Sequence, residues 1–399
     1  MLIQLLSTKT QYFMTIKPIK VVTILGTRPE IIRLSRVMAK LETYCEHVLV
    51  HTGQNYDYEL NEVFFSDLGV RQPDHFLGVD TSSLGATVGG ILAESEKVLV
   101  SEKPDAVLIL GDTNSAIAAY IARRLKIPVY HMEAGNRCFD RNVPEETNRK
   151  MVDHISDFNL VYTEHAMRNL IAEGLHARRI YITGSPMREV LEYYRGEIES
   201  SQVLGELSLK PREYLLVSIH REENVDNPDN LTELVHALNQ LAEAHDCPII
   251  VSTHPRTRKR LDALTELKND KRISWMKPFG FHDYNKMQMK AKCVISDSGT
   301  IAEESSMLGF PAVTPRFSIE RPEAMDTGAI IACGYAAENI VRAAQAVIMQ
   351  HNEPAQQESE SFVPKDYLIT NTSQRVVNLI IGTAKLSNQW DGIREFTVD

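Results

Sequence analysis

The sequence lacks the features of a membrane-spanning or exported protein. No apolar run reaches the roughly 18 residues that a membrane span requires, and the opening MLIQLL lacks the basic segment of a signal peptide. Cysteine is also scarce, because the chain has five, an odd number without a CxxC pair. Such a set is typical of reduced thiols rather than of disulfides or a zinc site. We therefore expect a soluble, cytoplasmic protein.

The sequence also lacks a positive charge balance and two common nucleotide-binding motifs. Its formal net charge of -10 does not supply the positive field that nucleic acids or acidic membranes require of a binding protein. There is no GxGxxG run with an acidic residue about 20 positions later, and no GxxxxGKS or GxxxxGKT run. These absences disfavour a dinucleotide-dependent dehydrogenase and exclude the P-loop enzymes.

What the chain contains is the alternation of strands and helices of a two-domain α/β protein. Its 399 residues exceed one ordinary core, and the alternation predicts two doubly wound, Rossmann-like domains facing each other across a cleft. The expected strands are 19–25, 47–52, 106–110, 127–132, 158–162 and 179–182, then 214–219, 248–252, 293–296 and 312–315, with a polar loop over 71–85. The expected parts are a disordered extension (1–13), an N-terminal domain (14–187), a C-terminal domain (188–369) and a final segment (370–399) whose helix crosses back to the N-terminal domain.

Three carboxylates mark the crevice of the first domain. Asp112 follows the apolar run AVLIL and Glu133 follows IPVYHM, so both come just past the carboxyl end of an expected strand, where open α/β sheets bind ligands. Glu145 stands in the first turn of the next helix, where the helix dipole favours anions. Acids gathered at one crevice indicate proton transfer or, as an alternative, metal binding. The adjacent Glu146 reads as a helix-face or ion-pair residue.

The second domain offers groups suited to a diphosphate at its own strand ends. His220 follows an apolar run and His254 opens the basic run HPRTRKR. Ser298, within SDSGT, precedes a helix whose free backbone amides favour anions, and Arg321 provides a planar guanidinium fork. Each also has an ordinary structural interpretation, as a core histidine, a solvated helix face or a helix cap. With Arg28 of the GTRPE turn, this layout fits a nucleotide diphosphate sugar whose sugar lies under the acids.

Nine ordered motifs resemble those of the non-hydrolysing UDP-N-acetylglucosamine 2-epimerases. They are GTRPE (26–30), TGQNYD (52–57), GDT (111–113), HMEAGNR (131–137), PEETNR (144–149), HREEN (220–224), HPRTRKR (254–260), SDSGT with EE (296–304) and ERPE (320–323). The resemblance covers about residues 20–385. It implies the GT-B architecture of two facing domains, a homodimer, and no dissociable redox cofactor. We also expect no metal ion, because the diphosphate already has cationic partners in the second domain.

Position by position, the resemblance implies roles for the residues singled out above. Asp112, Glu133 and Glu145 match the catalytic carboxylates of the family, and His220 matches the histidine near the leaving diphosphate. The residues implied in binding the UDP-sugar are Arg28, Arg137, His254, Ser298, Gly299, Thr300, Glu304 and Arg321, with Glu304 at the ribose hydroxyls. Some family members are activated by their own nucleotide sugar at a second site, for which Gln54, Arg221 and His254 are candidates.

One branch of the family resembles the chain more than the rest. EAGNRCFD, PEETNRK, GSPM (184–187) and KPFGFHDY (277–284) look like the enzymes that convert UDP-2-acetamido-2,6-dideoxy-L-talose into UDP-N-acetyl-L-fucosamine for surface polysaccharide. The enzymes that interconvert UDP-GlcNAc and UDP-ManNAc typically have Leu in place of Asn136 and SGG in place of residues 298–300. The resemblance therefore implies the 6-deoxy substrate, with UDP-GlcNAc and UDP-ManNAc as the alternative pair.

The expected mechanism follows from the chemistry of C2, which bears no acidifying carbonyl. UDP leaves C1 while a carboxylate removes the C2 proton, which gives a glycal, and UDP adds back after a proton reaches the opposite face. Because two acid/base groups on opposite faces are needed, we assign the C2 proton to Asp112 and Glu133, with Glu145 orienting or assisting. His220 and Arg321 would offset the charge on the departing phosphate.

Two other classes of protein share parts of this pattern. A GT-B glycosyltransferase would have the same fold and nucleotide pocket, but it would need an acceptor groove. A non-catalytic nucleotide-sugar sensor would keep the motifs of the second domain and could dispense with the acids of the first. The presence of Asp112, Glu133 and Glu145 together argues against the sensor.

Overall fold

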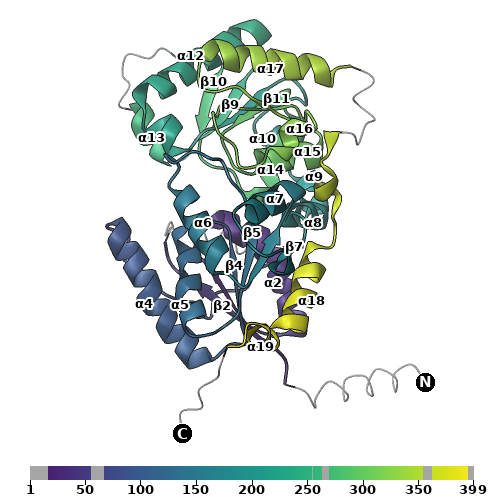
Figure 1. The fold of residues 1–399 in the computed structure, drawn as a ribbon. Coiled ribbons are helices and arrows are strands. Elements are labelled where there is room, and N and C mark those ends of the chain that lie inside the picture. The colour runs from purple at the N-terminus through teal and green to yellow at the C-terminus, as the bar shows by residue number, and fades with distance from the viewer. Residues whose placement is uncertain (1–16, 55–66, 254, 263–268, 354–361, 394–399) are drawn as a thin grey trace, which may run out of the picture.

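The structure, a computed structural model, describes residues 17–54, 67–253, 255–262, 269–353 and 362–393. The chain forms an N-terminal lobe and a C-terminal lobe, each built on a parallel sheet (Figure 1). The expected extension over residues 1–13 lies outside the described residues. No described helix is both long and apolar enough to cross a membrane.

The N-terminal lobe contains a seven-stranded parallel sheet in the order β3-β2-β1-β4-β5-β6-β7. The strands are β1 (Lys20–Leu25), β2 (Glu46–His51), β3 (His75–Phe76), β4 (Ala106–Leu110), β5 (Val129–Ala134), β6 (Phe158–Val161) and β7 (Ile180–Ile182). All five residues of β4 are buried, as expected for a central strand covered on both faces. One face packs on α2 (Arg28–Tyr44), α8 (Pro186–Tyr193) and α18 (Thr372–Thr383), and the other on α4 (Leu84–Glu102), η2 (Asn114–Ile117) and α5 (Ala118–Arg124).

The C-terminal lobe repeats this plan with six parallel strands in the order β10-β9-β8-β11-β12-β13. The strands are β8 (Leu215–Ser218), β9 (Ile249–Ser252), β10 (Ile273–Met276), β11 (Cys293–Ser296), β12 (Ala312–Thr314) and β13 (Ile331–Ala332). One face packs on α12 (Pro228–His245) and α17 (Ala337–His351), and the other on α10 (Val203–Glu206), α14 (Phe281–Lys290), α15 (Ile301–Leu308) and α16 (Glu323–Asp326).

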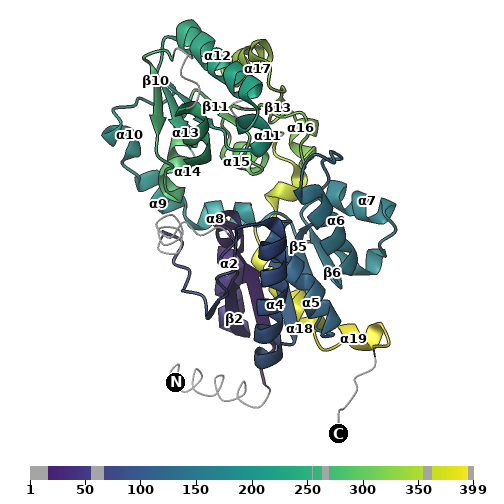
Figure 2. The same ribbon diagram turned by 90° about the vertical axis from the view of Figure 1, so that its left-hand side faces the viewer.

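The remaining helices connect these layers. They are α6 (Glu145–Ile155), α7 (Glu164–Ala172), η3 (Ala177–Arg179), α9 (Arg195–Ser200), α11 (Glu222–Val225), α13 (Pro255–Asp262), η5 (Lys365–Leu368) and α19 (Ser387–Trp390). The chain passes between the lobes twice. It leaves the N-terminal lobe after α8 and returns through η5 to α18, which lies beside α2 (Figures 1 and 2). The Thr383 hydroxyl at the end of α18 lies 2.6 Å from that of Tyr130 in β5.

The predicted fold class is confirmed, while three short strands were not predicted. β3 lies inside the expected polar loop 71–85, and β10 and β13 lie in stretches where no strand was expected. β3 and β13 have two residues each, too few for any alternation to show. The sequence of β10, ISWM, offers no continuous apolar run. All three are edge strands, each paired with the single strand beside it.

Both sheets have a topological switch point, at which strand order reverses. In the N-terminal sheet it lies between β1 and β4, and in the C-terminal sheet between β8 and β11. Open α/β sheets bind ligands outside the carboxyl ends of the strands at this point. The turns that follow these four strands are GTRPE, GDT, HREEN and SDSGT, so four of the nine motifs meet at the two switch points.

Candidate active site

The GTRPE turn is fixed by a buried carboxylate. Glu30 accepts hydrogen bonds from the backbone N–H groups of Gly26 (2.9 Å) and Thr27 (2.7 Å), and from the hydroxyl of Thr113 in the neighbouring GDT turn (3.0 Å). Gly26 has no room for a side chain, because a Cβ there would lie 2.1 Å from the hydroxyl oxygen of Thr52. This packing holds Arg28, the first residue of α2, at the edge of the sheet facing the other lobe.

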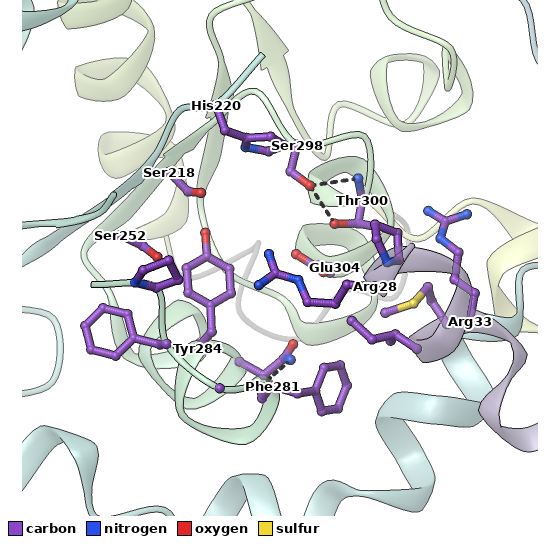
Figure 3. Close-up of a pocket in the computed structure, with 17 residues that line it drawn as sticks. Arg28, Arg33, Ser218, His220, Ser252, Phe281, Tyr284, Ser298, Thr300 and Glu304 are labelled. Atoms are coloured by element: carbon purple, nitrogen blue, oxygen red, sulfur yellow. Dashed lines mark hydrogen bonds between the residues drawn. The ribbon is translucent and has the colours of Figure 1, made fainter. Parts of the chain in front are cut away.

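A cavity lies between the lobes, and most of its walls come from the C-terminal lobe (Figure 3). Five predicted site residues line it, and they are Arg28, His220, Ser298, Thr300 and Glu304. The other walls combine apolar and hydroxyl-bearing side chains, among them Ser218, Phe281 and Tyr284. A largely apolar cavity with a few convergent polar groups is the usual form of a small-molecule site.

The loops after β8 and β11 are joined through Asp297, which is fully buried. Its carboxylate accepts from the backbone N–H groups of His220 (3.1 Å) and Arg221 (3.0 Å), and it lies 3.2 Å from the Nδ1 atom of His220. The hydroxyls of Ser298 and Thr300 lie 2.9 Å apart beside the start of α15. Asp297 therefore orients the predicted histidine ring, a role that was not predicted although the residue lies in the SDSGT motif.

Glu304 forms part of the cavity wall from the first turns of α15. Its carboxylate is buried and accepts a hydrogen bond from the side-chain amide of Gln288 at 2.7 Å. Burial raises the pKa of Glu304, which the Gln288 hydrogen bond partly counteracts. In Figure 3 the Arg28 side chain extends toward the middle of the cavity, whereas the Arg33 guanidinium points away from it.

Glu133 has an unusual backbone and an enclosed carboxylate. Its φ angle is 65°, and β5 changes register at this residue against β6. Residues other than glycine rarely adopt this conformation, and where they do it is often at functional sites. Its carboxylate contacts the guanidinium groups of Arg33 and, at 2.6 Å, Arg321. Burial alone would raise the pKa of Glu133, but the two guanidinium groups outweigh it, so the pKa is lowered.

Asp112 and Glu145 lie together but differ in their partners. Asp112 forms a two-point ion pair with Arg149, at 2.6 and 3.0 Å. Glu145 opens α6, and no described side chain hydrogen-bonds its carboxylate. Burial, helped by the nearby charge of Asp112, raises the pKa of Glu145. Glu146 pairs with Arg149 at 3.0 Å, which confirms its interpretation as an ion-pair residue.

The three acids stand behind the cavity wall rather than in it. Arg33 lines the cavity and contacts Glu133 directly. Asp112 and Glu145 lie further along the same edge of the N-terminal sheet. Among the described residues, no three His, Cys, Asp or Glu side chains come together as a metal site. The acids are surrounded by arginines, an arrangement that controls proton affinity.

Arg137 was predicted to bind substrate, and in the structure its guanidinium has partners within the protein. The side chain is fully buried and forms ion pairs with Asp153 (2.7 Å) and Glu173 (2.6 Å). It also donates to the backbone carbonyl of Asn136. Through these contacts Arg137 stabilises the loop that follows β5, the strand that contains Glu133.

Other predicted residues also have partners within the protein. Arg321 does not line the cavity, because it donates to the Gly299 carbonyl (2.8 Å) and pairs with Glu133 and Glu303. Gln54 accepts from the backbone N–H of Ser115 at 2.9 Å. Arg221 donates to the Asp297 carbonyl at 3.1 Å. His254 lies outside the described residues.

Four charged residues that tie these acids together were not predicted, namely Arg33, Arg149, Glu303 and Glu320. Glu320 lies 3.7 Å from Arg149 and 3.5 Å from Arg221, and its carboxylate is paired with Arg316. Arg149 and Glu320 belong to quoted motifs, so their motif membership was an available signal. Glu303 is also part of a quoted motif, as the first residue of the EE pair. Arg33 gave no such signal, because its meeting with Glu303 depends on how the lobes face each other.

The comparisons with known proteins agree with this geometry. The model of the family described as UDP-N-acetylglucosamine 2-epimerase matches residues 39–381. The structure is similar to that of the UDP-N-acetylglucosamine 2-epimerase of Rickettsia bellii, at 43% identity and a TM-score of 0.87, over 94% of this chain and 100% of that one. It is also similar to the Methanocaldococcus jannaschii UDP-GlcNAc 2-epimerase solved with UDP-GlcNAc and UDP, at 35% identity and a TM-score of 0.83, over 91% and 99%.

A further relative acts on a different sugar. The UDP-2,3-diacetamido-2,3-dideoxy-D-glucuronate 2-epimerase of Pseudomonas aeruginosa is 34% identical over 333 residues, which are 82% of this chain and 91% of the relative. The predicted family and enzyme class are thus confirmed, and the predicted GT-B-like fold agrees with the epimerase structures. The chain belongs to the UDP-N-acetylglucosamine 2-epimerase family, isomerases that act on UDP-sugars.

Proposed function

We propose that the protein inverts C2 of a UDP-N-acetylhexosamine by eliminating UDP to a glycal and adding it back. The observation that carries the proposal is the position of Glu133. This carboxylate, at the end of β5 beside the strands of the N-terminal switch point, lies one arginine away from a cavity built on the C-terminal switch point. A nucleotide held on one lobe would therefore place its sugar under the acids of the other.

The C-terminal lobe supplies the groups that suit the nucleotide. The Ser298 and Thr300 hydroxyls at the start of α15 would bind phosphate oxygens, and Arg28 would supply positive charge from the opposite wall. Glu304 would accept hydrogen bonds from the ribose hydroxyls. His220, oriented through Asp297, would stabilise the negative charge that forms on the departing diphosphate.

The N-terminal lobe supplies the acids and bases for C2. In elimination, a carboxylate takes the C2 proton, the C–H electron pair forms the C1–C2 double bond, and the C1–O pair leaves with UDP. Re-addition reverses these steps from the other face. Asp112 and Glu133 are paired with arginines and suit the role of base. Burial raises the pKa of Glu145, so this residue keeps its proton to higher pH and suits the role of proton donor.

We further propose UDP-2-acetamido-2,6-dideoxy-L-talose as the substrate, with UDP-N-acetyl-L-fucosamine as the product for surface polysaccharide. Asn136, one of the residues that suggest this branch, lies with its side-chain amide 3.4 Å from the Glu133 carboxylate. The branch-specific residue thus lies at the end of the site assigned to the sugar. The alternative is UDP-GlcNAc with UDP-ManNAc, which is supported by the UDP-GlcNAc complex of the M. jannaschii relative.

One experiment tests both parts of the proposal. The protein is incubated in deuterated water with each nucleotide sugar alone, and the products are followed by NMR. We expect deuterium at C2 and a new UDP-hexosamine, with faster turnover of the 6-deoxy sugar than of UDP-GlcNAc. Product without deuterium would refute the proton-transfer scheme. Faster turnover of UDP-GlcNAc would assign the alternative substrate and leave the mechanism in place.

We also propose that the protein acts as a cytoplasmic homodimer. The outer face of α4 exposes Leu84 and Val100, and a Cβ added at Gly85 or Gly89 would meet nothing within 4 Å. This face offers a second copy a close approach between helices. A Gly89→Arg variant should reduce the molar mass in solution to that of one chain, whereas a wild-type protein of single-chain mass would refute the dimer.

A further inference from the structure

Glu303, next to the predicted ribose-binding Glu304, is one of the enclosed carboxylates of the site. It is fully buried in α15. One of its oxygens accepts from Arg33 (2.6 Å) and from the Nε atom of Arg321 (2.9 Å). The other accepts from the hydroxyl of Ser185, at the start of α8. Glu303 thus has three partners, two of them on the opposite lobe, and no access to solvent.

The same two arginines hold Glu133. Arg33 uses one terminal nitrogen for Glu303 and the other for Glu133. Arg321 uses its Nε atom for Glu303 and a terminal nitrogen for Glu133, the latter at 2.6 Å. Each lobe contributes one arginine and one glutamate, so the four side chains form a closed ring of alternating charge across the lobe boundary.

A contribution to folding stability does not by itself explain why this ring of buried charges is present. Removing charged groups from water costs free energy that their mutual attraction often fails to recover, and apolar replacements of buried ion pairs are frequently neutral or stabilising. A guanidinium is a rigid planar fork, so a carboxylate on one side of it fixes where the other side points. Glu303 therefore helps to determine where Arg33 and Arg321 present their remaining N–H groups, and each arginine presents a terminal nitrogen to Glu133.

We propose that Glu303 is a positioning residue for the epimerisation, acting through Arg33 and Arg321 to set the geometry and charge of the Glu133 carboxylate. This inference rests on the proposed function of Glu133 at C2. Glu303 lies on α15, whose start forms the cavity wall through Thr300 and Glu304. A nucleotide bound there therefore stabilises the same helix that completes the ring around Glu133.

The sign of the electrostatic effect is fixed by the charges that face Glu133. They are Arg33 from α2, Arg321 ahead of α16, Arg149 from α6 and, behind the arginines, Glu303 from α15. The neutral hydroxyl of Tyr162, after β6, also faces the carboxylate. The arginines lower the pKa of Glu133, and Glu303 moderates them by neutralising part of their charge. Without the Glu303 charge, the pKa of Glu133 falls further, and Glu133 becomes a weaker base.

The test is the pH dependence of turnover in a Glu303→Gln variant. Glutamine keeps the size of the side chain but leaves the ring with a net positive charge. We expect kcat to fall about tenfold, because a weaker base removes the C2 proton more slowly. The acid limb of the kcat profile should move about one pH unit lower, because the pKa of the base is lower. The affinity for UDP should stay within about threefold of the wild-type value, since Glu303 lies outside the cavity wall.

Two matched variants separate charge from packing. Glu303→Asp keeps the charge, and the acid limb should remain near the wild-type position even where kcat is lower. Ser185→Ala removes the neutral partner of Glu303 and should leave the limb unmoved. Thermal unfolding of each variant shows that it is folded. If the acid limb of the kcat profile does not move in a folded Glu303→Gln variant, the inference about Glu303 is overturned and the proposed function stands. Absence of C2 exchange in the wild type would overturn the proposed function and the inference with it.

Discussion

The two switch points share a topology but differ in chemistry. At β8 and β11 the polar groups are mostly hydroxyls, backbone amides and one oriented histidine, and they line an accessible cavity. At β1 and β4 the neighbouring acids and arginines are largely enclosed in ion pairs. A negatively charged ligand such as a diphosphate needs hydrogen-bond donors, which the C-terminal switch point supplies. A reaction that moves protons needs carboxylates of controlled proton affinity, which lie beside the N-terminal switch point.

The lobes also differ in how their charges are balanced. Glu133 and Asp112 are joined through arginines to Glu303 and Glu320 of the C-terminal lobe. The cavity wall, by contrast, is lined mainly by the C-terminal lobe itself. The nucleotide surface is therefore mostly a property of one lobe, whereas the acid surface is completed only when both lobes are in place.

The largest effect should come from Asp112→Asn, which tests whether the enclosed acids carry the chemistry. Asparagine cannot take up a proton, so turnover should fall by a factor of about 100 or more. UDP should bind nearly as well as before, because Asp112 lies outside the cavity wall. Turnover and UDP titration on the same preparation would show the contrast.

The matched control for Asp112 is Asp105→Asn. Asp105 lies just before β4, at the opposite end of the strand that Asp112 follows, and it accepts from the backbone N–H of Lys20 at 2.9 Å. We expect near wild-type turnover in this variant. Equal losses from Asp105→Asn and Asp112→Asn would show that the strand, rather than the acid, is sensitive.

A smaller effect is expected from Glu145→Gln, which tests the difference in proton affinity within the acid edge. Burial raises the pKa of Glu145, so its proton is retained to higher pH than that of an ordinary glutamate and is lost as pH rises. If Glu145 donates, wild-type activity must fall on the basic side. The Gln variant should lose about 30-fold in kcat near neutral pH and show no such basic limb, because it has no proton to donate.

The control for Glu145 is Glu164→Gln. Glu164 opens α7 as Glu145 opens α6, but its carboxylate pairs with Lys365 at the surface (2.7 Å). Its turnover should stay within about twofold of the wild type, since exposed ion pairs contribute little. A basic limb that persists in Glu145→Gln would assign the proton donor to another residue.

The sequence predicted most of the architecture because parallel strands buried on both faces read as continuous apolar runs. AVLIL and its neighbours were therefore easily recognised, and the residues just after them, such as Asp112 and His220, could be placed at the sheet edge. β3 and β13, with two residues each, leave no such run. Their existence depends on neighbouring strands, which a local pattern does not contain.

Side-chain partners were harder to predict than positions. Arg137 stands four residues after Glu133 in one motif, yet its guanidinium forms ion pairs with Asp153 of α6 and Glu173 at the end of α7. Arg321 was expected at a phosphate and instead crosses to Glu133. Motif membership places a residue near a site, but the direction of a long side chain depends on charges from distant parts of the chain. For Glu303 one of those charges, Arg33, comes from the other lobe.

The smallest effect should come from Glu304→Gln, which tests the cavity side of the comparison. A carboxylate can accept two hydrogen bonds from the ribose hydroxyls, and an amide oxygen accepts them less strongly. UDP should therefore bind about tenfold more weakly, a loss of about 1.4 kcal/mol in binding free energy. Turnover at saturating substrate should change little. Because burial raises the pKa of Glu304, the carboxylate becomes protonated as pH falls, and the difference in UDP affinity between wild type and variant should shrink toward acid pH.

Glu323→Gln is the matched control, since Glu323 is buried in the same lobe and accepts from the Tyr367 hydroxyl. A variant that binds UDP normally but turns over slowly would place Glu304 with the acids, and the division between the two switch points would then fail.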